Sequence, residues 1–237
     1  MNRQAIDQLL PRLTRDLHTG SLTTASLAAH LTEATGGTDA AGAWTWRHAY
    51  DLVQSAAILA DRDVPLASDP AARLAMLTAG AGARPTETRR SEVQVRLQQF
   101  STPLPYAYVA AAAAAIRPGD VVLEPSAGTG ALAHMAARAG GKLVLNEIDP
   151  FRALLLQAVF SAPLSAHDGE HIDDLLDRRH VADVVLMNPP FSSSVSRAAD
   201  PTIALRHAVV AARRLAPGGQ LVAILPMAAC AERQPAL

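Results

Sequence analysis

The first eighty or so residues carry apolar side chains at spacings of three and four, the pattern of amphipathic helices. Such positions are Ile6, Leu9, Leu10, Leu13, Trp46, Tyr50, Val53 and Ala57. The stretch 21–31 opens with Ser and Thr, residues that commonly start helices. Small residues, a proline and clustered charge over 79–90 predict a linker. We therefore expect a helical N-terminal region and linker over residues 1–90.

From about residue 93 the pattern changes to short apolar runs bounded by turn residues. The runs are 121–124, 143–146, 184–187 and 221–225, and the helical stretches between them are 130–139, 150–160 and 204–215. This alternation predicts βαβ units and a parallel sheet that is covered on both faces. We therefore expect an α/β fold with a Rossmann-like sheet over residues 91–237.

Composition narrows the class of protein. Hydrophobic residues make up 49% of the 237 residues, enough for a substantial core. Neither a secretory signal nor an apolar run long enough for a bilayer occurs, and the lone cysteine, Cys230, excludes a disulfide framework within the chain. We expect a soluble cytoplasmic protein. The net charge of −1 argues against a strongly basic module that binds nucleic acid through charge alone.

The first candidate site follows the predicted strand 121–124. Its sequence, Glu-Pro-Ser-Ala-Gly-Thr-Gly over 124–130, is rich in small residues that let the backbone approach a ligand, and glycine tolerates a positive φ. A loop of this kind suits a nucleotide, although an ordinary glycine-rich turn would look similar. The spacing differs from the G-x-G-x-x-G of dinucleotide-binding proteins. The binding candidates are Glu124, Ser126, Gly128 and Gly130.

The second candidate site lies at the end of the next predicted strand, where Glu147, Ile148 and Asp149 precede Pro150. A carboxylate at the tip of the second strand can accept hydrogen bonds from both hydroxyls of a ribose. An aspartate just before a proline also suits the N-cap of a helix. We assign the ribose to Glu147 and the cap to Asp149, and we include Ile148 among the binding residues.

Asp168 is the third candidate, at the expected end of the third strand, where its carboxylate can accept a hydrogen bond from an adenine amino group. An exposed loop aspartate is an equally good interpretation of the spacing. The surrounding His167-x-x-Glu170-His171 also fits a metalloprotease pattern. We reject that interpretation because Gly169 suits a ligand-bearing helix poorly and a third ligand is not evident. No metal site is predicted.

The decisive segment is Asn188-Pro189-Pro190-Phe191, after the predicted strand 184–187. Two consecutive prolines cannot continue a central strand, so they stiffen the loop that carries Asn188. The Asn188 amide and the Pro189 carbonyl can hold a planar amine, and Phe191 can stack on its ring. A nucleobase would have to leave the duplex stack to reach such a pocket.

The segment 124–130, Glu147, Asp168 and the segment 188–191 follow one another along the chain. In this order they resemble the motifs of class I amino-methyltransferases that use S-adenosylmethionine (SAM). Upstream, Phe100-Ser-Thr102-Pro103 resembles the Phe-x-Thr-Pro segment that DNA adenine-N6 methyltransferases place over the methionine end of the cofactor. The resemblance covers about residues 96–227. It implies SAM as cofactor, the strand order 3-2-1-4-5, and N6 of adenine in DNA as the methyl acceptor.

The resemblance also assigns roles to residues. The catalytic set is Asn188, Pro189, Pro190 and Phe191. The cofactor-binding set is Thr102, Pro103, Glu124, Ser126, Gly128, Gly130, Glu147, Ile148, Asp168 and Asn188. Transfer would be direct, without a covalent nucleophile, because Cys230 lies outside these segments.

Two departures from the family pattern matter. Ser126 stands where the family often has a third glycine, and the chain ends soon after the fifth predicted strand. We therefore expect a C-terminally incomplete core that exposes an apolar edge at 221–225 and is weakly active or inactive alone.

The whole stretch of about residues 96–227 is also similar to the methylase part of bacterial methylase–helicase fusions related to strawberry notch. A helicase or a C-terminal continuation, in trans or in a longer chain, is thus an expected partner besides DNA. Alternative substrates are an rRNA base or a protein glutamine. A truncated SAM-binding or partner-docking module without catalysis is the alternative from another class.

Overall fold

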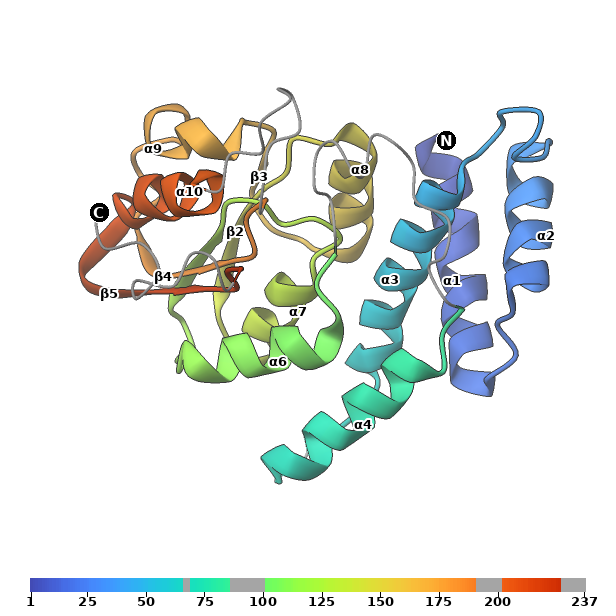
Figure 1. Ribbon diagram of the computed structural model, residues 1–237, viewed down its shortest axis with the longest axis horizontal. Coiled ribbons are helices and arrows are strands. Elements are labelled where there is room, and N and C mark those ends of the chain that lie inside the picture. The colour runs from blue at the N-terminus through green and yellow to red at the C-terminus, as the bar shows by residue number, and fades with distance from the viewer. Residues whose placement is uncertain (66–68, 86–100, 191–201, 227–237) are drawn as a thin grey trace.

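The computed structural model describes residues 1–65, 69–85, 101–190 and 202–226 (Figure 1). Its helices are α1 (Arg3–Thr19), α2 (Thr24–Thr35), α3 (Trp46–Arg62), α4 (Pro70–Gly82), α6 (Leu104–Ala113), α7 (Ala131–Arg138), α8 (Pro150–Val159), the 3-10 helix η1 (Gly169–His171), α9 (Ile172–Leu175) and α10 (Ile203–Ala212). Its strands are β1 (Val121–Glu124), β2 (Lys142–Asn146), β3 (Leu164–Ser165), β4 (Ala182–Met187) and β5 (Leu215–Ala223). No helix in these ranges is long and apolar enough to cross a membrane.

The N-terminal region is helical, as its periodicity predicts. Helix α1 buries one apolar face against α3, and side-chain N-caps start α1, α2, α3 and α4. The predicted linker over 79–90 is wrong at its beginning, because α4 continues through Gly82. Asp69 caps this helix and Pro70 occupies its first turn, so a run rich in alanine stays helical despite two glycines.

The sheet is parallel throughout and has the order β3-β2-β1-β4-β5, which confirms the predicted fold class. Strand β5 begins well before the predicted run 221–225 and takes in Pro217 and Gly218, which read as a turn in the sequence. An edge strand tolerates both residues, and a register shift opposite Ala182 and Val184 absorbs them. The side chains of 221–223 are only partly buried at this edge.

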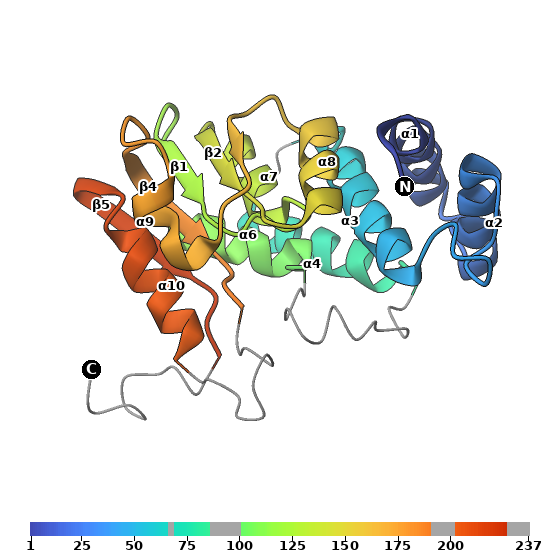
Figure 2. The ribbon, with the colours of Figure 1, turned by 90° about the horizontal axis from the view of Figure 1, so that it is seen from above.

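Helices cover both faces of the sheet (Figure 2). Val122, Val184 and Leu186 pack on the face covered by α6, α7 and α8. Their neighbours Leu123, Val185 and Met187 point to the opposite face, which carries α9 and α10. This alternation of fully buried residues is what a doubly covered parallel sheet requires. The short η1 and α9 were not predicted, because so few residues show no helical period.

Helices α1 and α3 lie beside α8, and α4 packs on α6 (Figure 1). Helix α3 contacts α7 and α8, and α1 also reaches α8. One hydrophobic cluster extends from Ile6 in α1 to Leu186 in β4. The predicted regions 1–90 and 91–237 therefore share a core, and the position of a boundary between them stays a prediction.

Candidate functional site

The loops after β1, β2 and β3 meet at one edge of the sheet because the carboxyl ends of parallel strands lie together. Buried Asn146 joins them: its Nδ2 donates to the carbonyls of Pro125 and His167, both at 2.9 Å. Its Oδ1 accepts from the Ser165 hydroxyl and the His167 N–H, both at 2.8 Å. Sequence analysis did not single out Asn146, although a polar residue closing an apolar strand was a usable signal.

The loop between β1 and α7 depends on glycine at two positions. Gly128 has φ +56° and Gly130 has φ +92°, a region that side chains with a Cβ rarely adopt. A Cβ on Gly130 would also lie 2.4 Å from Cε2 of Phe160 and 2.9 Å from Cδ2 of Leu156. The loop is thus pressed against α8 and the residue that follows it, which fixes its shape.

Glu147 lies at the tip of β2, 6% exposed, and its carboxylate touches that loop. One oxygen accepts from the Gly128 N–H at 2.7 Å and the other from the Asp149 N–H at 2.8 Å. Burial raises the pKa of Glu147, and the positive charge of Arg152 opposes that rise. The predicted N-cap is confirmed, since Asp149 accepts from the N–H groups of Phe151 and Arg152. The apolar side chain of Ile148 is 56% exposed beside this carboxylate.

A second buried carboxylate, Glu124, ends β1 and accepts a hydrogen bond from the backbone N–H of Ala133. Its Oε2 has no hydrogen-bond partner among the described residues. Burial raises the pKa of Glu124 well above its ordinary value, and the nearby Glu147 raises it further. The glycine loop is therefore flanked by two carboxylates that favour a cation or several hydrogen-bond donors.

Asp168 follows β3 by three residues, is exposed, and accepts from the Glu170 N–H as the N-cap of η1. The adjoining Gly169 is packed tightly, because a Cβ there would lie 3.1 Å from Ser126 Oγ. The segment that carries Asp168 thus lies against the glycine loop. Both interpretations of Asp168 from the sequence, an adenine acceptor and a loop aspartate, are compatible with this placement.

Asn188 follows β4 directly, and its Nδ2 donates to Thr102 Oγ1 at 2.9 Å. Its Oδ1 is buried and has no hydrogen-bond partner in the described ranges. The next residue, Pro189, is buried, whereas Pro103 is exposed. The structure thus brings the segment before α6 to the Asn-Pro-Pro loop. Phe191 and Phe100 lie outside the described residues.

Sequence analysis missed three residues at this edge, namely Asp51, Gln54 and Arg152. Arg152 of α8 pairs with Asp51 of α3, and Thr129 of the glycine loop donates to Gln54 of α3 at 3.1 Å. Asp51 and Gln54 are ordinary polar positions in a helical pattern. No local spacing connects them to a loop so far along the chain.

The family model of the methyltransferase small domain matches residues 113–232. The chain belongs to this family. It is a SAM-dependent methyltransferase, and SAM is its methyl donor. The match includes the glycine loop, the β2 tip, Asp168 and the Asn188 loop, but not α1 to α4.

Solved structures of methyltransferases are similar to the chain at low identity. A proposed RNA methyltransferase of Pyrococcus horikoshii is 21% identical with a TM-score of 0.44, over 61% of this chain and 70% of its own. TrmN from Thermus thermophilus is 17% identical with a TM-score of 0.44, over 96% of this chain and 70% of TrmN. A methyltransferase homologue of P. horikoshii is 18% identical with a TM-score of 0.40, over 90% of this chain and 80% of the homologue. No curated protein matches the chain.

The residues at the sheet edge fit SAM chemically. SAM carries a ribose diol, an adenine amine, an ammonium group and a sulfonium charge. The carboxylate of Glu147 suits the ribose, and the unpartnered Oε2 of buried Glu124 suits a donor or cation. The exposed side chains of Ile148 and Asp168 suit the face and the amino group of the adenine. The roles of Glu147 and Asp168 are those that the sequence analysis proposes, whereas it names Glu124 and Ile148 only as cofactor-binding residues.

The affinity for SAM is expected to fall as the pH is lowered through the raised pKa of Glu147. Above that pKa the carboxylate is ionised and makes charge-assisted hydrogen bonds to the ribose, and below it the neutral acid accepts them more weakly. Calorimetric titration with SAM over a pH series measures this. Glu147→Gln, which cannot ionise there, is the control and should bind weakly with a flatter profile. A flat profile in the wild-type protein would contradict the assignment.

Proposed function

We propose that this methyltransferase transfers the SAM methyl group to the exocyclic N6 amine of adenine in DNA. The observation that carries the proposal is the geometry of Asn188. Thr102 accepts from Nδ2 at 2.9 Å, so the amide is held in one orientation, and the buried Oδ1 has no partner in the described part of the chain. A buried oxygen without a partner costs free energy unless a ligand donates to it.

The chemistry of such a site follows from the acceptors that it offers. When bound, SAM supplies a methyl group activated by a positively charged sulfur. Asn188 Oδ1 and the Pro189 carbonyl would each accept an N–H of the amine and so align its lone pair with the methyl carbon. Both oxygens would stabilise the positive charge that develops on the nitrogen as it takes up the methyl group and the sulfur leaves as a neutral thioether. The nitrogen then loses one proton to water.

The argument for adenine in DNA rests on the segment around Thr102. Phe100-Ser-Thr102-Pro103 resembles the segment of DNA adenine-N6 methyltransferases, and Thr102 contacts Asn188. A planar base with two N–H donors on one amine suits the pair of acceptors. The base would enter by flipping out of the duplex, with Phe191 as the stacking partner.

A methyl-transfer assay with tritium-labelled SAM tests this proposal. The chain is incubated with matched DNA and RNA oligonucleotides of one sequence and with a glutamine-containing protein. We expect label in the DNA. Label confined to RNA or protein would replace the proposed substrate by one of its alternatives. Bound SAM without transfer to any of them, with the chain in excess so that even weak activity is visible, would indicate a non-catalytic module and overturn the proposal.

A further inference from the structure

Helix α3 presents a polar stripe to the cofactor edge of the sheet. Arg47, Asp51 and Gln54 are spaced by four and three residues, so they share one face of the helix. Most of the other residues on this part of α3 are buried and apolar. Each member of the stripe contacts a different residue next to the proposed SAM site.

The central contact is the buried ion pair between Asp51, 1% exposed, and Arg152, 3% exposed. It is bidentate, with Nη2 to Oδ1 at 2.9 Å and Nε to Oδ2 at 3.1 Å. Arg152 also donates to Ser101 Oγ at 3.2 Å, and a Cβ on Gly128 would lie 3.7 Å from its Nη1. The guanidinium thus lies between the glycine loop and the segment that carries Thr102.

The other two contacts reach the flanks of the same site. Gln54 accepts from the Thr129 hydroxyl at 3.1 Å, at the end of the glycine loop. Arg47 forms a hydrogen-bonded ion pair with Asp149, whose backbone N–H binds Glu147. The stripe therefore contacts three elements around Glu147. These are the glycine loop through Thr129, helix α8 through Arg152, and the N-cap of α8 through Asp149.

We propose that α3 is a positioning element for SAM, which holds the glycine loop and Glu147 in their binding arrangement through Asp51 and Arg152. The inference rests on the proposed cofactor site. Its α3 residues lie outside the matched range 113–232, so the family match does not account for their role. A site that is already ordered before binding loses less conformational entropy when the ligand binds, so the ligand binds more tightly. Loss of Asp51 would leave the Arg152 charge buried without its main partner.

Arg152 also acts on Glu147 through its charge. The charge of Arg152 lowers the pKa of Glu147, whereas the negative charge of Asp149 raises it. The charge of Glu147 in turn raises the pKa of the neighbouring Glu124. Asp51 fixes the position of the guanidinium by its bidentate contact. A change that neutralises Arg152 should therefore move the pH dependence of SAM binding, which a purely structural role would not do.

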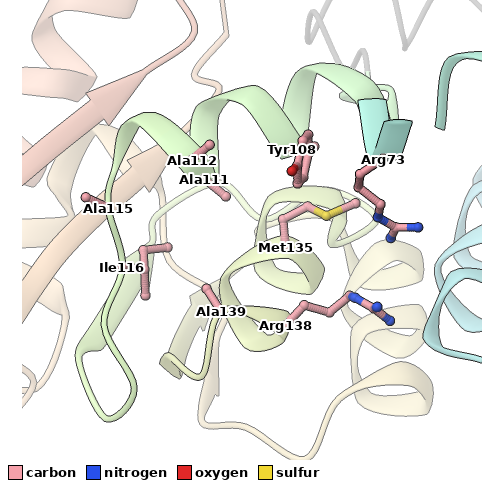
Figure 3. Close-up of a pocket in the computed structure, with 9 residues that line it drawn as sticks. All are labelled: Arg73, Tyr108, Ala111, Ala112, Ala115, Ile116, Met135, Arg138 and Ala139. Atoms are coloured by element: carbon pink, nitrogen blue, oxygen red, sulfur yellow. The ribbon is translucent and has the colours of Figure 1, made fainter. Parts of the chain in front are cut away.

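The other end of α3 offers a matched control. Asp61 forms a buried pair with Arg73 at 2.5 Å and accepts from His134 Nε2 at 2.8 Å. Arg73 and Arg138 point to one end of a cavity of about 240 Å³ between α4, α6 and α7 (Figure 3). None of the proposed site residues lines that cavity. Asp61 thus supplies a buried ion pair on the same helix without a described contact to the glycine loop.

Calorimetry with SAM, without nucleic acid, compares Asp51→Asn, Gln54→Leu and Asp61→Asn with the wild-type protein below their unfolding temperatures. We expect Asp51→Asn to weaken SAM binding about tenfold or more and Gln54→Leu to weaken it about threefold. Asp61→Asn should lower the Tm comparably to Asp51→Asn and change the SAM Kd less than about twofold. Arg152→Gln should shift the loss of affinity to a higher pH.

The inference is wrong if Asp51→Asn and Gln54→Leu lower the Tm and leave the SAM Kd at the wild-type value. If Asp51→Asn does not fold, the SAM Kd of Gln54→Leu alone is the test, and a wild-type value would refute the inference. Because no methyl acceptor is present, the result is independent of the substrate. A protein that depends on Asp51 for SAM but does not methylate adenine would refute the proposed function alone.

Discussion

Replacing Asn188 with alanine is expected to lower the rate of methyl transfer about 100-fold or more, the scale of losing one preorganised polar contact to a transition state. The buried Oδ1 of Asn188 has no partner among the described residues, and Thr102 holds the amide in place. The loss should fall on kcat, because the contact stabilises charge that develops only during transfer. SAM affinity should change far less, since Glu147 and the glycine loop make the proposed contacts to it.

Single-turnover kinetics and calorimetry on the same preparations measure the two effects separately. Thr102→Val is the matched second variant, because it keeps the side-chain shape and removes only the acceptor for Asn188 Nδ2. We expect it to slow transfer about tenfold, since the amide remains but is no longer oriented. An unchanged rate in Asn188→Ala would remove the catalytic role, and a lost SAM affinity would show that Asn188 acts mainly in cofactor binding, the other role assigned to it.

Glu147→Ala is expected to weaken SAM binding by about 1.5–3 kcal/mol, the range for a hydrogen bond to a charged group, or about 10- to 150-fold in Kd. Two causes act together. The ribose loses its charged acceptor, and the N–H groups of Gly128 and Asp149 lose the carboxylate that joins them. The glycine loop should also become less ordered. We therefore expect a loss of affinity near the upper end of this range.

Calorimetry with SAM checks this, with circular dichroism to show that the variant is folded. Glu170→Ala is the control, a nearby glutamate that pairs with Arg206 and has no proposed role in binding. It should bind SAM as the wild-type protein does. Equal affinities for wild-type protein and Glu147→Ala would remove Glu147 from the cofactor site.

Four of the five strands could be predicted because each is a short apolar run between turn residues. Their order came from the resemblance to class I methyltransferases, and β3, with only two residues, has no apolar run of its own. The prediction failed where local signals mislead. Pro217 and Gly218 read as a turn, yet they lie within β5 because an edge strand can hold them at a register shift. Two glycines near the end of α4 suggested a linker, yet the helix continues through Gly82.

The candidate site was predictable only in part, for a related reason. Glycine spacing and an acid at a strand tip are local signals, so they pointed to Gly128 and Glu147. The Asp51–Arg152 pair is a long-range contact between two charged residues that look like ordinary surface positions in the sequence. Only the packing of α3 on α8 makes that pair buried, and no periodicity of a single helix contains this information.

The most direct test of the central claim is a single-turnover reaction with the chain in excess over a labelled single-stranded DNA oligonucleotide, followed by mass spectrometry of its nucleosides. An excess of protein makes even a slow transfer visible. We expect N6-methyldeoxyadenosine to form with SAM, and to form about 100-fold more slowly with Asn188→Ala. If SAM binds and no methylated adenine forms, or if Asn188→Ala forms it at the wild-type rate, the account of this site is wrong.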